Sequence, residues 1–264
     1  MNQVGVIGAG VMGEALIAAL ISYGTAPGSI SISEKRKDRA DELRTRYGIK
    51  VEDVATNVST ADALLLVVKP QDMAAVLDEI KGLVNKSAVV ITFAAGKKIS
   101  FIEQGLGTGN PVVRVMPNTP TLVGAGMAAI SLGAGVSADQ SKFVSGFLGA
   151  TGKVIEVSED LQDAVTATSG SGPAYFFRFV EAMVDGAKAL GLSQADATTL
   201  TVQTIVGAAK LLDESGKSAT TLRENVTSPN GTTAAALASF ESHQLEDVVA
   251  QAMKAARDRS QELA

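Results

Sequence analysis

The hydrophobic residues of the first 157 positions occur in short runs rich in Val, Ile and Leu, separated by glycine, proline or charged residues. Such runs are typical of strands in a parallel sheet that is buried on both faces. Stretches with helical spacing lie between them, which predicts an α/β fold with a doubly wound sheet. The predicted strands are 4–7, 30–33, 63–68, 88–93, 111–116, 126–132 and 153–157, with helices over 11–20 and 138–148.

The pattern changes near residue 158, because strand-like runs stop there and the remainder reads almost entirely as helix. We therefore expect two domains, residues 1–158 and an all-α domain over 159–264. About a hundred helical residues without a sheet favour burial against a second subunit, so we expect a homodimer. Apolar residues share a helix face at Val180, Met183, Val184, Ala187 and Leu190, and at Val202, Ile205, Val206, Ala209 and Leu212.

Serine or threonine three positions before an acidic residue is a common signal for a helix N-terminus. This spacing predicts helix starts at Ser100 with Glu103, at Ser193 with Asp196 and at Thr221 with Glu224.

A glycine turn joins the first strand to the first helix. Gly8 can form the tight turn, Gly10 leaves the backbone open to a pyrophosphate, and Gly13 lets the helix pack close to the strand. The phosphates would meet unpaired N–H groups and the positive end of the helix dipole. Because the motif follows a strand and opens a helix, it predicts a dinucleotide site rather than an ordinary turn.

The second predicted strand ends where such folds read the adenosine ribose, and both signs of charge stand there. Glu34 alone would indicate NAD, whereas Lys35, Arg36 and Lys37 could bind the extra phosphate of NADP. We favour NADPH, with NADH as the other donor. The alternative is that these charges form the solvated first turn of the next helix.

Three later strands end in loops that also suit a ligand, because open α/β sheets bind ligands at the carboxyl ends of their strands. These loops contain Lys69 and Pro70, then Ala94 to Gly96, then Pro117 and Asn118. The small residues of the middle loop would permit close approach by a flat ring.

Two polar stretches do not fit a plain helical bundle. Residues 169–175, Ser-Gly-Ser-Gly-Pro-Ala-Tyr, interrupt a helical region. They form either a simple break or a kink that admits a cofactor or a neighbouring chain. Residues 225–233 place several hydroxyls before an Ala-rich helix, and a helix start of this kind could bind a small carboxylate. Capping alone would explain part of that second signal.

Composition excludes several classes of function. The chain has 264 residues with 46% hydrophobic and 19% charged residues, a balance typical of globular proteins. It has no cysteine, which removes thiolate chemistry and thiolate metal sites, and a single histidine, which argues against His triads and multi-His metal sites. A net charge of −5 gives no footprint for nucleic acid. No apolar run is long enough to cross a membrane and the start does not resemble a signal peptide, so we expect no membrane partner and a cytoplasmic location. From the composition we also expect no bound metal and no nucleic-acid partner.

The motifs together resemble the pyrroline-5-carboxylate reductases, which catalyse the last step of proline biosynthesis. The shared motifs are Ile7-Gly8-Ala9-Gly10 with Met12, Val68-Lys69-Pro70, Ala94-Ala95-Gly96, Arg114 to Pro120, Ser169 to Tyr175 and Ser228 to Thr233. The resemblance implies an N-terminal Rossmann domain, a helical dimerisation domain, and dimers that often assemble into decamers. It implies hydride transfer from NAD(P)H to a cyclic imine that carries a carboxylate.

The resemblance also implies roles for individual residues. Thr233 would orient the substrate or relay a proton, and the N–H groups of Thr232 and Thr233 would hold the carboxylate. The substrate-binding positions are Glu159, Asn225, Ser228, Thr232 and Thr233. The cofactor-binding positions are Ile7, Gly8, Ala9, Gly10, Val11, Met12, Lys35, Arg36, Asn57, Val67, Val68, Lys69, Pro70, Phe93, Ala94, Ala95 and Asn118.

One position departs from the family pattern. Asn230 stands where the family has the first glycine of Gly-Gly-Thr-Thr, so the turn there must accept Asn, which tolerates left-handed backbone better than most residues. Two alternatives remain open at this point: another imine or 3-hydroxyacid reductase on the same scaffold, and a non-catalytic nucleotide-binding dimer. Lys188 and Lys210 are not in a polar cluster of the kind a hydroxyacid reductase would use.

Overall fold

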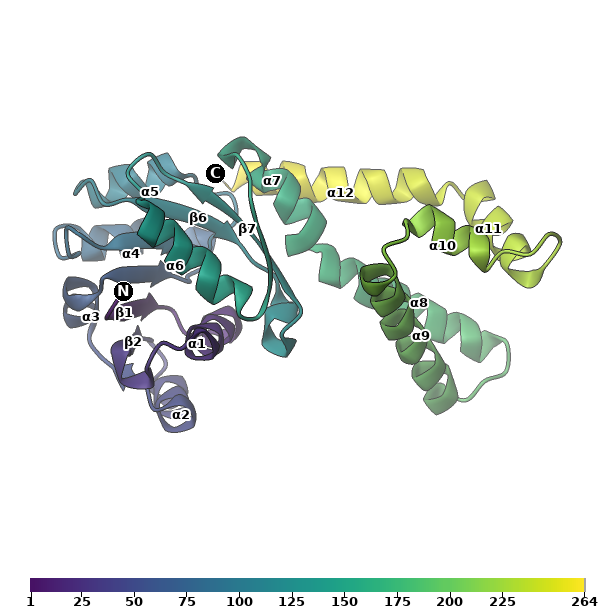
Figure 1. Ribbon diagram of the computed structural model, residues 1–264, viewed down its shortest axis with the longest axis horizontal. Coiled ribbons are helices and arrows are strands. Elements are labelled where there is room, and N and C mark those ends of the chain that lie inside the picture. The colour runs from purple at the N-terminus through teal and green to yellow at the C-terminus, as the bar shows by residue number, and fades with distance from the viewer. Residues whose placement is uncertain (264) are drawn as a thin grey trace. The chain divides into compact units, whose positions relative to one another are not determined.

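The computed structural model describes residues 1–263, and its first half is built around one eight-stranded sheet (Figure 1). The order is β3-β2-β1-β4-β5-β6-β7-β8, all neighbours being parallel except β6 and β7. This confirms the predicted doubly wound α/β fold. The antiparallel pairing of β6 with β7 was not indicated by the hydrophobic runs of the sequence. The strands are β1 Val4–Ile7, β2 Ile30–Ser33, β3 Lys50–Val51, β4 Ala63–Leu66, β5 Val89–Thr92, β6 Val112–Met116, β7 Gly126–Leu132 and β8 Gly152–Glu156.

Helices cover both faces of the sheet, which is why the inner strands β1, β4 and β5 consist mostly of apolar residues with little alternation. Leu16 and Leu20 of the first helix pack with Phe147 and the β1 and β2 side chains in one core cluster. Leu77 and Ile102 form the second cluster with the opposite face of β4 and β5. The helices of this region are α1 Val11–Tyr23, α2 Lys37–Tyr47, α3 Val54–Thr60, α4 Met73–Ile80, α5 Ile99–Leu106 and α6 Ala138–Gly149.

Every element after β8 is helical, as expected. The stretch at 169–175 does not end a helix abruptly. Thr166–Gly170 form a π-helical segment, in which the Ser171 N–H donates to the Thr166 carbonyl at 2.8 Å, and α8 follows at once. The elements are α7 Gln162–Val165, the π-helix Thr166–Gly170, α8 Gly172–Ala189, α9 Gln194–Glu214, α10 Ala219–Asn225, α11 Thr232–Ser242 and α12 Leu245–Glu262.

The three helices predicted from this spacing are present, but two of the three predicted capping residues are wrong. Ser193 caps α9 as expected, its side chain accepting the Asp196 N–H. In α10 the cap is Ser218, which accepts the N–H of Thr221, so the helix begins before Thr221. Helix α5 begins at Ile99 after Lys98 and has no side-chain cap. Spacing alone therefore does not distinguish the capping residue from a hydroxyl in the first turn.

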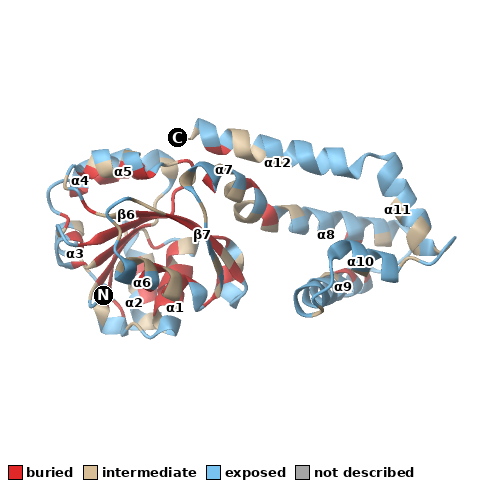
Figure 2. Cartoon of the chain, turned by 45° about the horizontal axis from the view of Figure 1, so that its top comes forward, coloured by how far each residue is buried: buried red, intermediate tan, exposed pale blue. Residues whose placement is uncertain are grey.

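The chain divides into two compact units. One comprises Met1–Pro173 with the C-terminal residues from Ala255, and the other comprises Ala174–Lys254. In the first unit β1, β2, β4, β5 and β6 are buried along their whole length, whereas the helices of the second unit are largely exposed (Figure 2). Over residues 1–263, we find no helix whose length and apolar character would let it cross a lipid bilayer.

Candidate functional site

A cavity of about 560 Å³ opens at the carboxyl ends of β1 and β4 in the first unit. The chain runs outward from β1 through β2 to β3 and returns to β4 on the other side of β1, so the strand order reverses here. Ligands of open α/β sheets bind at such switch points. The lining residues are Ile7, Gly8, Gly10, Ser33, Glu34, Lys35, Glu52, Asp53, Val54, Val67, Val68, Lys69, Asp72, Val76 and Glu79.

The glycine turn has the geometry that a pyrophosphate requires. Gly8 has φ +88°, and a Cβ there would lie 2.5 Å from the Val67 carbonyl oxygen. A Cβ on Gly13 would lie 2.4 Å from the Gly8 carbonyl oxygen, so both positions exclude a side chain. Gly10, by contrast, faces open space and precedes α1 with no side-chain cap. The first N–H groups of α1 are thus available to an anion, and the cradle fits a dinucleotide.

Charged side chains hold the Ala9 peptide on both sides. Its N–H donates to Glu34 Oε2 at 2.8 Å, and its carbonyl accepts from Arg39 Nε at 3.2 Å. Arg39 also donates to Glu42 and to Glu14. Hydrogen bonds to Glu42 and then Glu14 raise the pKa of the Arg39 guanidinium. These contacts fix the turn before any ligand binds.

Glu14, at the start of α1, belongs to the same network. It also accepts hydrogen bonds from Arg46 and from Tyr47 Oη. Burial opposes ionisation, but the hydrogen bonds from Arg39, Tyr47 and Arg46 outweigh it and lower the pKa of the Glu14 carboxyl.

The ribose-end residues divide into two groups. Lys35 lines the cavity, whereas Arg36 is the N-cap of α2 and is not among the lining residues. Asn57 is fully buried, and its side chain bonds Ser31 Oγ at 2.7 Å, Ser33 Oγ at 2.9 Å and the Val6 carbonyl at 3.2 Å. Asn57 therefore offers no exposed atom to the cavity in this structure, and its place among the cofactor-binding residues stays a prediction. It ties β1 to β2 beneath the cavity.

The strand-end loops contribute unequally. Val67, Val68 and Lys69 line the cavity, and Pro70 begins a short 3₁₀ turn beside them. After β5, Phe93 and Ala94 are buried, and Ala95 is half-buried. These three residues are not part of the cavity lining, and neither are the cofactor candidates Ala9, Val11, Met12 and Pro70. The structure thus brings the glycine turn and the loop after β4 together at the cavity. The loop after β5 is not part of the lining.

Asn118 acts as a structural link between β6 and its neighbours. Its Oδ1 accepts the Met127 N–H at 2.8 Å, and its Nδ2 donates to the Ser169 carbonyl at 3.0 Å. It therefore joins the start of β7 to the π-helical segment, and its side chain is buried.

Glu159 belongs to a partly buried ion cluster around Arg114, a residue of β6. Arg114 is 4% exposed and lies 3.5 Å from Glu159 Oε1 and 3.3 Å from Asp163 Oδ1. Glu159 also accepts the Ile99 N–H at 2.6 Å, and Asp163 accepts from Ser260 Oγ at 2.7 Å. One arginine facing two carboxylates leaves the cluster with excess negative charge, and Glu159 is its most exposed carboxylate, at 31%.

The remaining substrate candidates lie in the second unit at the start of α11. Gly231 is the N-cap and no side chain caps this helix, so the N–H groups of Thr232 and Thr233 have no partner within it. Asn230 has φ 60°, which confirms that the turn places Asn in the left-handed region. A Cβ on Gly231 would contact Ser228 Oγ, so a side chain at this position would force the Ser228 hydroxyl to move. Asn225 ends α10 and is exposed.

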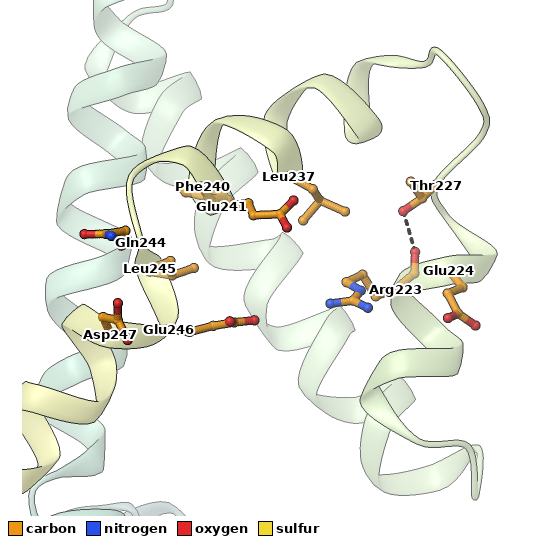
Figure 3. Close-up of a pocket in the computed structure, with 10 residues that line it drawn as sticks. All are labelled: Arg223, Glu224, Thr227, Leu237, Phe240, Glu241, Gln244, Leu245, Glu246 and Asp247. Carbon is orange, nitrogen blue, oxygen red and sulfur yellow. Dashed lines mark hydrogen bonds between the residues drawn. The ribbon is translucent and has the colours of Figure 1, made fainter.

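The second unit also has a cavity of about 640 Å³ of its own (Figure 3). Figure 3 shows the carboxylates of Glu224, Glu241 and Glu246 separated from one another around it. Within residues 1–263, no group of three or more His, Cys, Asp or Glu side chains is arranged to hold a metal ion. The switch-point cavity of the first unit, with its glycine cradle, is the better candidate for a dinucleotide.

Two groups of residues that line the cavity were not predicted from the sequence. Glu52, Asp53 and Val54 follow the two-residue strand β3, which is too short to give a hydrophobic run. Asp72, Val76 and Glu79 come from the start and body of α4. Only the topology, which places β3 and α4 beside the switch point, could identify these residues.

Comparison with known proteins agrees with both halves of the chain. A family model described as pyrroline-5-carboxylate reductase dimerisation matches residues 159–263, and one described as NADP oxidoreductase coenzyme F420-dependent matches residues 3–96. A pyrroline-5-carboxylate reductase of Corynebacterium melassecola is 43% identical over 267 residues, covering 100% of this chain and 99% of that protein. The enzyme of Pseudomonas aeruginosa is 40% identical, with 99% and 97% covered.

Solved structures give the same result. The pyrroline-5-carboxylate reductase of Coxiella burnetii matches with a TM-score of 0.91 at 36% identity, over 100% of this chain and 98% of that one. The pyrroline carboxylate reductase of Plasmodium falciparum, solved with NADP bound, matches with a TM-score of 0.90 at 29% identity, over 99% and 98%. With full-length similarity in sequence and in structure, this chain belongs to the pyrroline-5-carboxylate reductase family.

Proposed function

We propose that this protein reduces 1-pyrroline-5-carboxylate to proline with NADPH, and that NADH can serve as the other donor. The observation that carries the proposal is the glycine cradle at the β1/β4 switch point, found in a chain that belongs to this reductase family. Bound NADPH supplies the hydride that the imine carbon accepts.

The first unit would hold the dinucleotide. We assign the pyrophosphate to the turn Ile7 to Met12 and the adenosine ribose end to Lys35 and Arg36, with Asn57 supporting that end from beneath. The nicotinamide half is assigned to 67–70 and 93–95, with Asn118 as a neighbouring support.

The second unit would hold the substrate carboxylate. The N–H groups of Thr232 and Thr233 are free at the N-terminus of α11, where a negative charge is favoured. Asn225 and Ser228 are assigned to the substrate from the preceding turn. In the first unit, Glu159 is assigned to the substrate, because its carboxylate would favour the protonated, cationic form of the imine.

The chemistry asks little of the protein beyond orientation. A protonated imine accepts a hydride readily, so holding the two reacting carbons together supplies several kcal/mol of the barrier reduction. Thr233 would orient the ring nitrogen or relay a proton, with a modest contribution to the rate. This agrees with a chain that has one histidine and no cysteine.

The test is a turnover assay with the purified full-length protein, 1-pyrroline-5-carboxylate and either NADPH or NADH. We expect loss of nicotinamide absorbance matched by formation of proline. Thr233→Ala should lower kcat/KM by about tenfold, whereas Ser239→Ala on the same helix should not. Full activity in Thr233→Ala would remove the role of its hydroxyl, and no turnover with either dinucleotide would favour a non-catalytic nucleotide-binding dimer.

The alternative function to test is that of a 3-hydroxyacid reductase. It would use a lysine of the helical region as proton donor, but Lys188 and Lys210 lie on helix surfaces near Asp185 and Glu214, at 3.7 and 3.9 Å. Turnover of a 3-hydroxy acid with NADP⁺, without turnover of the imine, would replace the proposal.

We also propose that the active form is a homodimer built through residues 159–263, and that dimers assemble further into a decamer. We place the protein in the cytoplasm, without nucleic-acid or membrane partners. Light scattering of the purified protein would distinguish a dimer from a decamer by mass.

A further inference from the structure

We propose that Ser260, in the last turn of α12, is a positioning residue for the nicotinamide of the bound dinucleotide. It holds the end of α12 against the loop after β5, residues 93–98, and so fixes the conformation of that loop. The inference rests on the proposed function, which assigns residues 93–95 to the nicotinamide half.

The loop after β5 leaves the sheet next to the switch-point cavity. In the parallel pairing of β4 with β5, Leu66 lies opposite Thr92, and the Phe93 N–H donates to the Leu66 carbonyl at 3.2 Å. Phe93 therefore begins the loop beside Val67, which lines the cavity. A shift of this loop would displace a nicotinamide bound against it, and hydride transfer requires the two reacting carbons to lie about 3–3.5 Å apart.

The last turn of α12 packs directly on the middle of this loop. Gly96 is buried, and a Cβ on it would lie 2.6 Å from the Ser260 carbonyl oxygen and 2.8 Å from Leu263 Cβ. The residues from Ala255 onward belong to the same compact unit as the loop, although α12 begins in the other unit. The end of α12 is therefore part of the wall that supports the loop.

A hydrogen bond and an ion pair anchor this last turn to the sheet. Ser260 is 2% exposed, and its Oγ donates to Asp163 Oδ1 at 2.7 Å. The same carboxylate oxygen accepts from Arg114 Nη2 at 3.3 Å. Arg114 lies in β6, the strand beside β5, and its side chain is 4% exposed. Because the chain of contacts ends on a buried strand, Ser260 has a fixed support.

The same arginine also supports the far end of the loop. Arg114 Nη1 lies 3.5 Å from Glu159 Oε1, which accepts the Ile99 N–H at 2.6 Å. Ile99 begins α5 directly after the loop, so Glu159 also places a negative charge at the N-terminus of that helix, where it is favourable. The loop is thus held at two points, and the contact at Gly96 is the one that depends on Ser260.

The experiment compares two ligands and one rate in the full-length protein. Calorimetry gives the dissociation constants of NADPH and of 2′-phospho-ADP-ribose, which lacks the nicotinamide. Ser260→Ala removes the hydrogen bond to Asp163. We expect kcat with 1-pyrroline-5-carboxylate to fall about tenfold and the NADPH dissociation constant to rise about fivefold, because the loop is no longer preorganised. The dissociation constant of 2′-phospho-ADP-ribose should change by less than about twofold, since the phosphate turn keeps its own contacts.

Gln261→Ala is the matched control, because it shortens the neighbouring, exposed side chain of the same turn. All three values should stay within about twofold of the unaltered protein. Ser260→Cys nearly keeps the volume of the side chain and provides a weaker donor, so it should show the same selective loss at a smaller size.

Equal weakening of both ligands in Ser260→Ala and Ser260→Cys would indicate a general loss of structure and would overturn the inference. So would unchanged NADPH affinity and kcat in Ser260→Ala. A selective loss of NADPH affinity in a protein that does not reduce the imine would refute the proposed reaction and leave the positioning role standing.

Discussion

The two compact units use their apolar residues in opposite ways. The first buries two clusters of aliphatic side chains on the two faces of its sheet. Among residues 174–254, all of which the structure describes, only Val184, Ala197 and Thr201 are buried. Large apolar residues stay exposed there, including Phe176 at 63%, Phe177 at 64% and Val206 at 53%.

The difference shows which unit can account for its own stability. Burial of apolar area is the main favourable term in folding, and the first unit has a complete core. The second unit has helices with good propensity but little to bury within one chain, and so large an exposed apolar surface marks an interface. The match of residues 159–263 to a dimerisation model supports an oligomer, and we propose that a second copy of the chain covers this surface.

The largest effect should follow from placing a charge on this exposed apolar surface. Leu200 is 56% exposed and lines an apolar groove with Met183 and Leu190. Leu200→Asp would bury an unpaired carboxylate at the interface and weaken dimer association by at least about 100-fold. Light scattering at graded concentrations measures the effect.

Thr198→Asp is the control, because it introduces the same charge two positions away, on the other side of α9. A dimer of unchanged affinity in Leu200→Asp would mean that this groove is not part of the interface. In both variants the dinucleotide affinity of the first unit should stay within about twofold, since its core is intact.

An effect of similar size is expected from the buried arginine. Arg114→Ala leaves Glu159 and Asp163 without their cation, and breaking such a pair costs about 3 kcal/mol of unfolding free energy. Arg178→Ala in the second unit removes an exposed pair with Glu181 and should cost less than about 0.5 kcal/mol. Urea unfolding of both variants gives the comparison, and equal costs would contradict it.

Gly96→Ala tests how closely the C-terminal turn packs on the loop after β5. Gly96 has φ +75°, and a Cβ would lie 2.6 Å from the Ser260 carbonyl oxygen and 2.8 Å from Leu263 Cβ. We expect a loss of about 2 kcal/mol from strain and clash together. Gly107→Ala has a similar φ of +65° but only a lysine side chain at 3.6 Å, so it isolates the backbone strain and should cost about half as much.

The smallest effect concerns acid pH. The folded-state pKa of Glu14 is lowered from its ordinary value of 4.5, so its contribution is complete above pH 4.5 and is lost as pH falls through the folded value. Glu14→Gln should therefore reduce stability at pH 6 by about 1 kcal/mol, because Arg46 and Glu42 at the outer side of the network are half-exposed. The difference from the unaltered protein should shrink below pH 4, as measured by urea midpoints. A difference that grows on acidification would contradict this.

The elements that can be predicted from sequence are those whose signal is local. Runs such as 4–7 and 126–132 identify buried strands, and glycines at 8, 10 and 13 identify the phosphate cradle, because each depends on neighbouring residues only. The antiparallel pairing of β7 with β6 and the two-residue β3 were not predicted, because pairing direction and strand order are set by distant contacts. Capping failed at Thr221 for a related reason: Ser218 stands three residues earlier and accepts the N–H of Thr221 itself, so Thr221 lies inside the first turn of α10.

The candidate site shows the same limit. Sequence motifs located Gly8, Lys35 and Val67, which meet at the switch point. They did not reveal that Asn57 lies beneath the cavity or that Arg114 anchors Glu159, since burial and ion pairing depend on the folded chain.

The position of Asn57 has a consequence for evolution of the first strand. A Cβ on Gly5 would lie 2.6 Å from Asn57 Oδ1, so Gly5 is constrained by this amide and not by the dinucleotide. A substitution at position 5 requires the Asn57 amide to move or to be lost, which also releases Ser31 and Ser33. These four positions should therefore covary among relatives as one group, independently of the glycines of the phosphate turn.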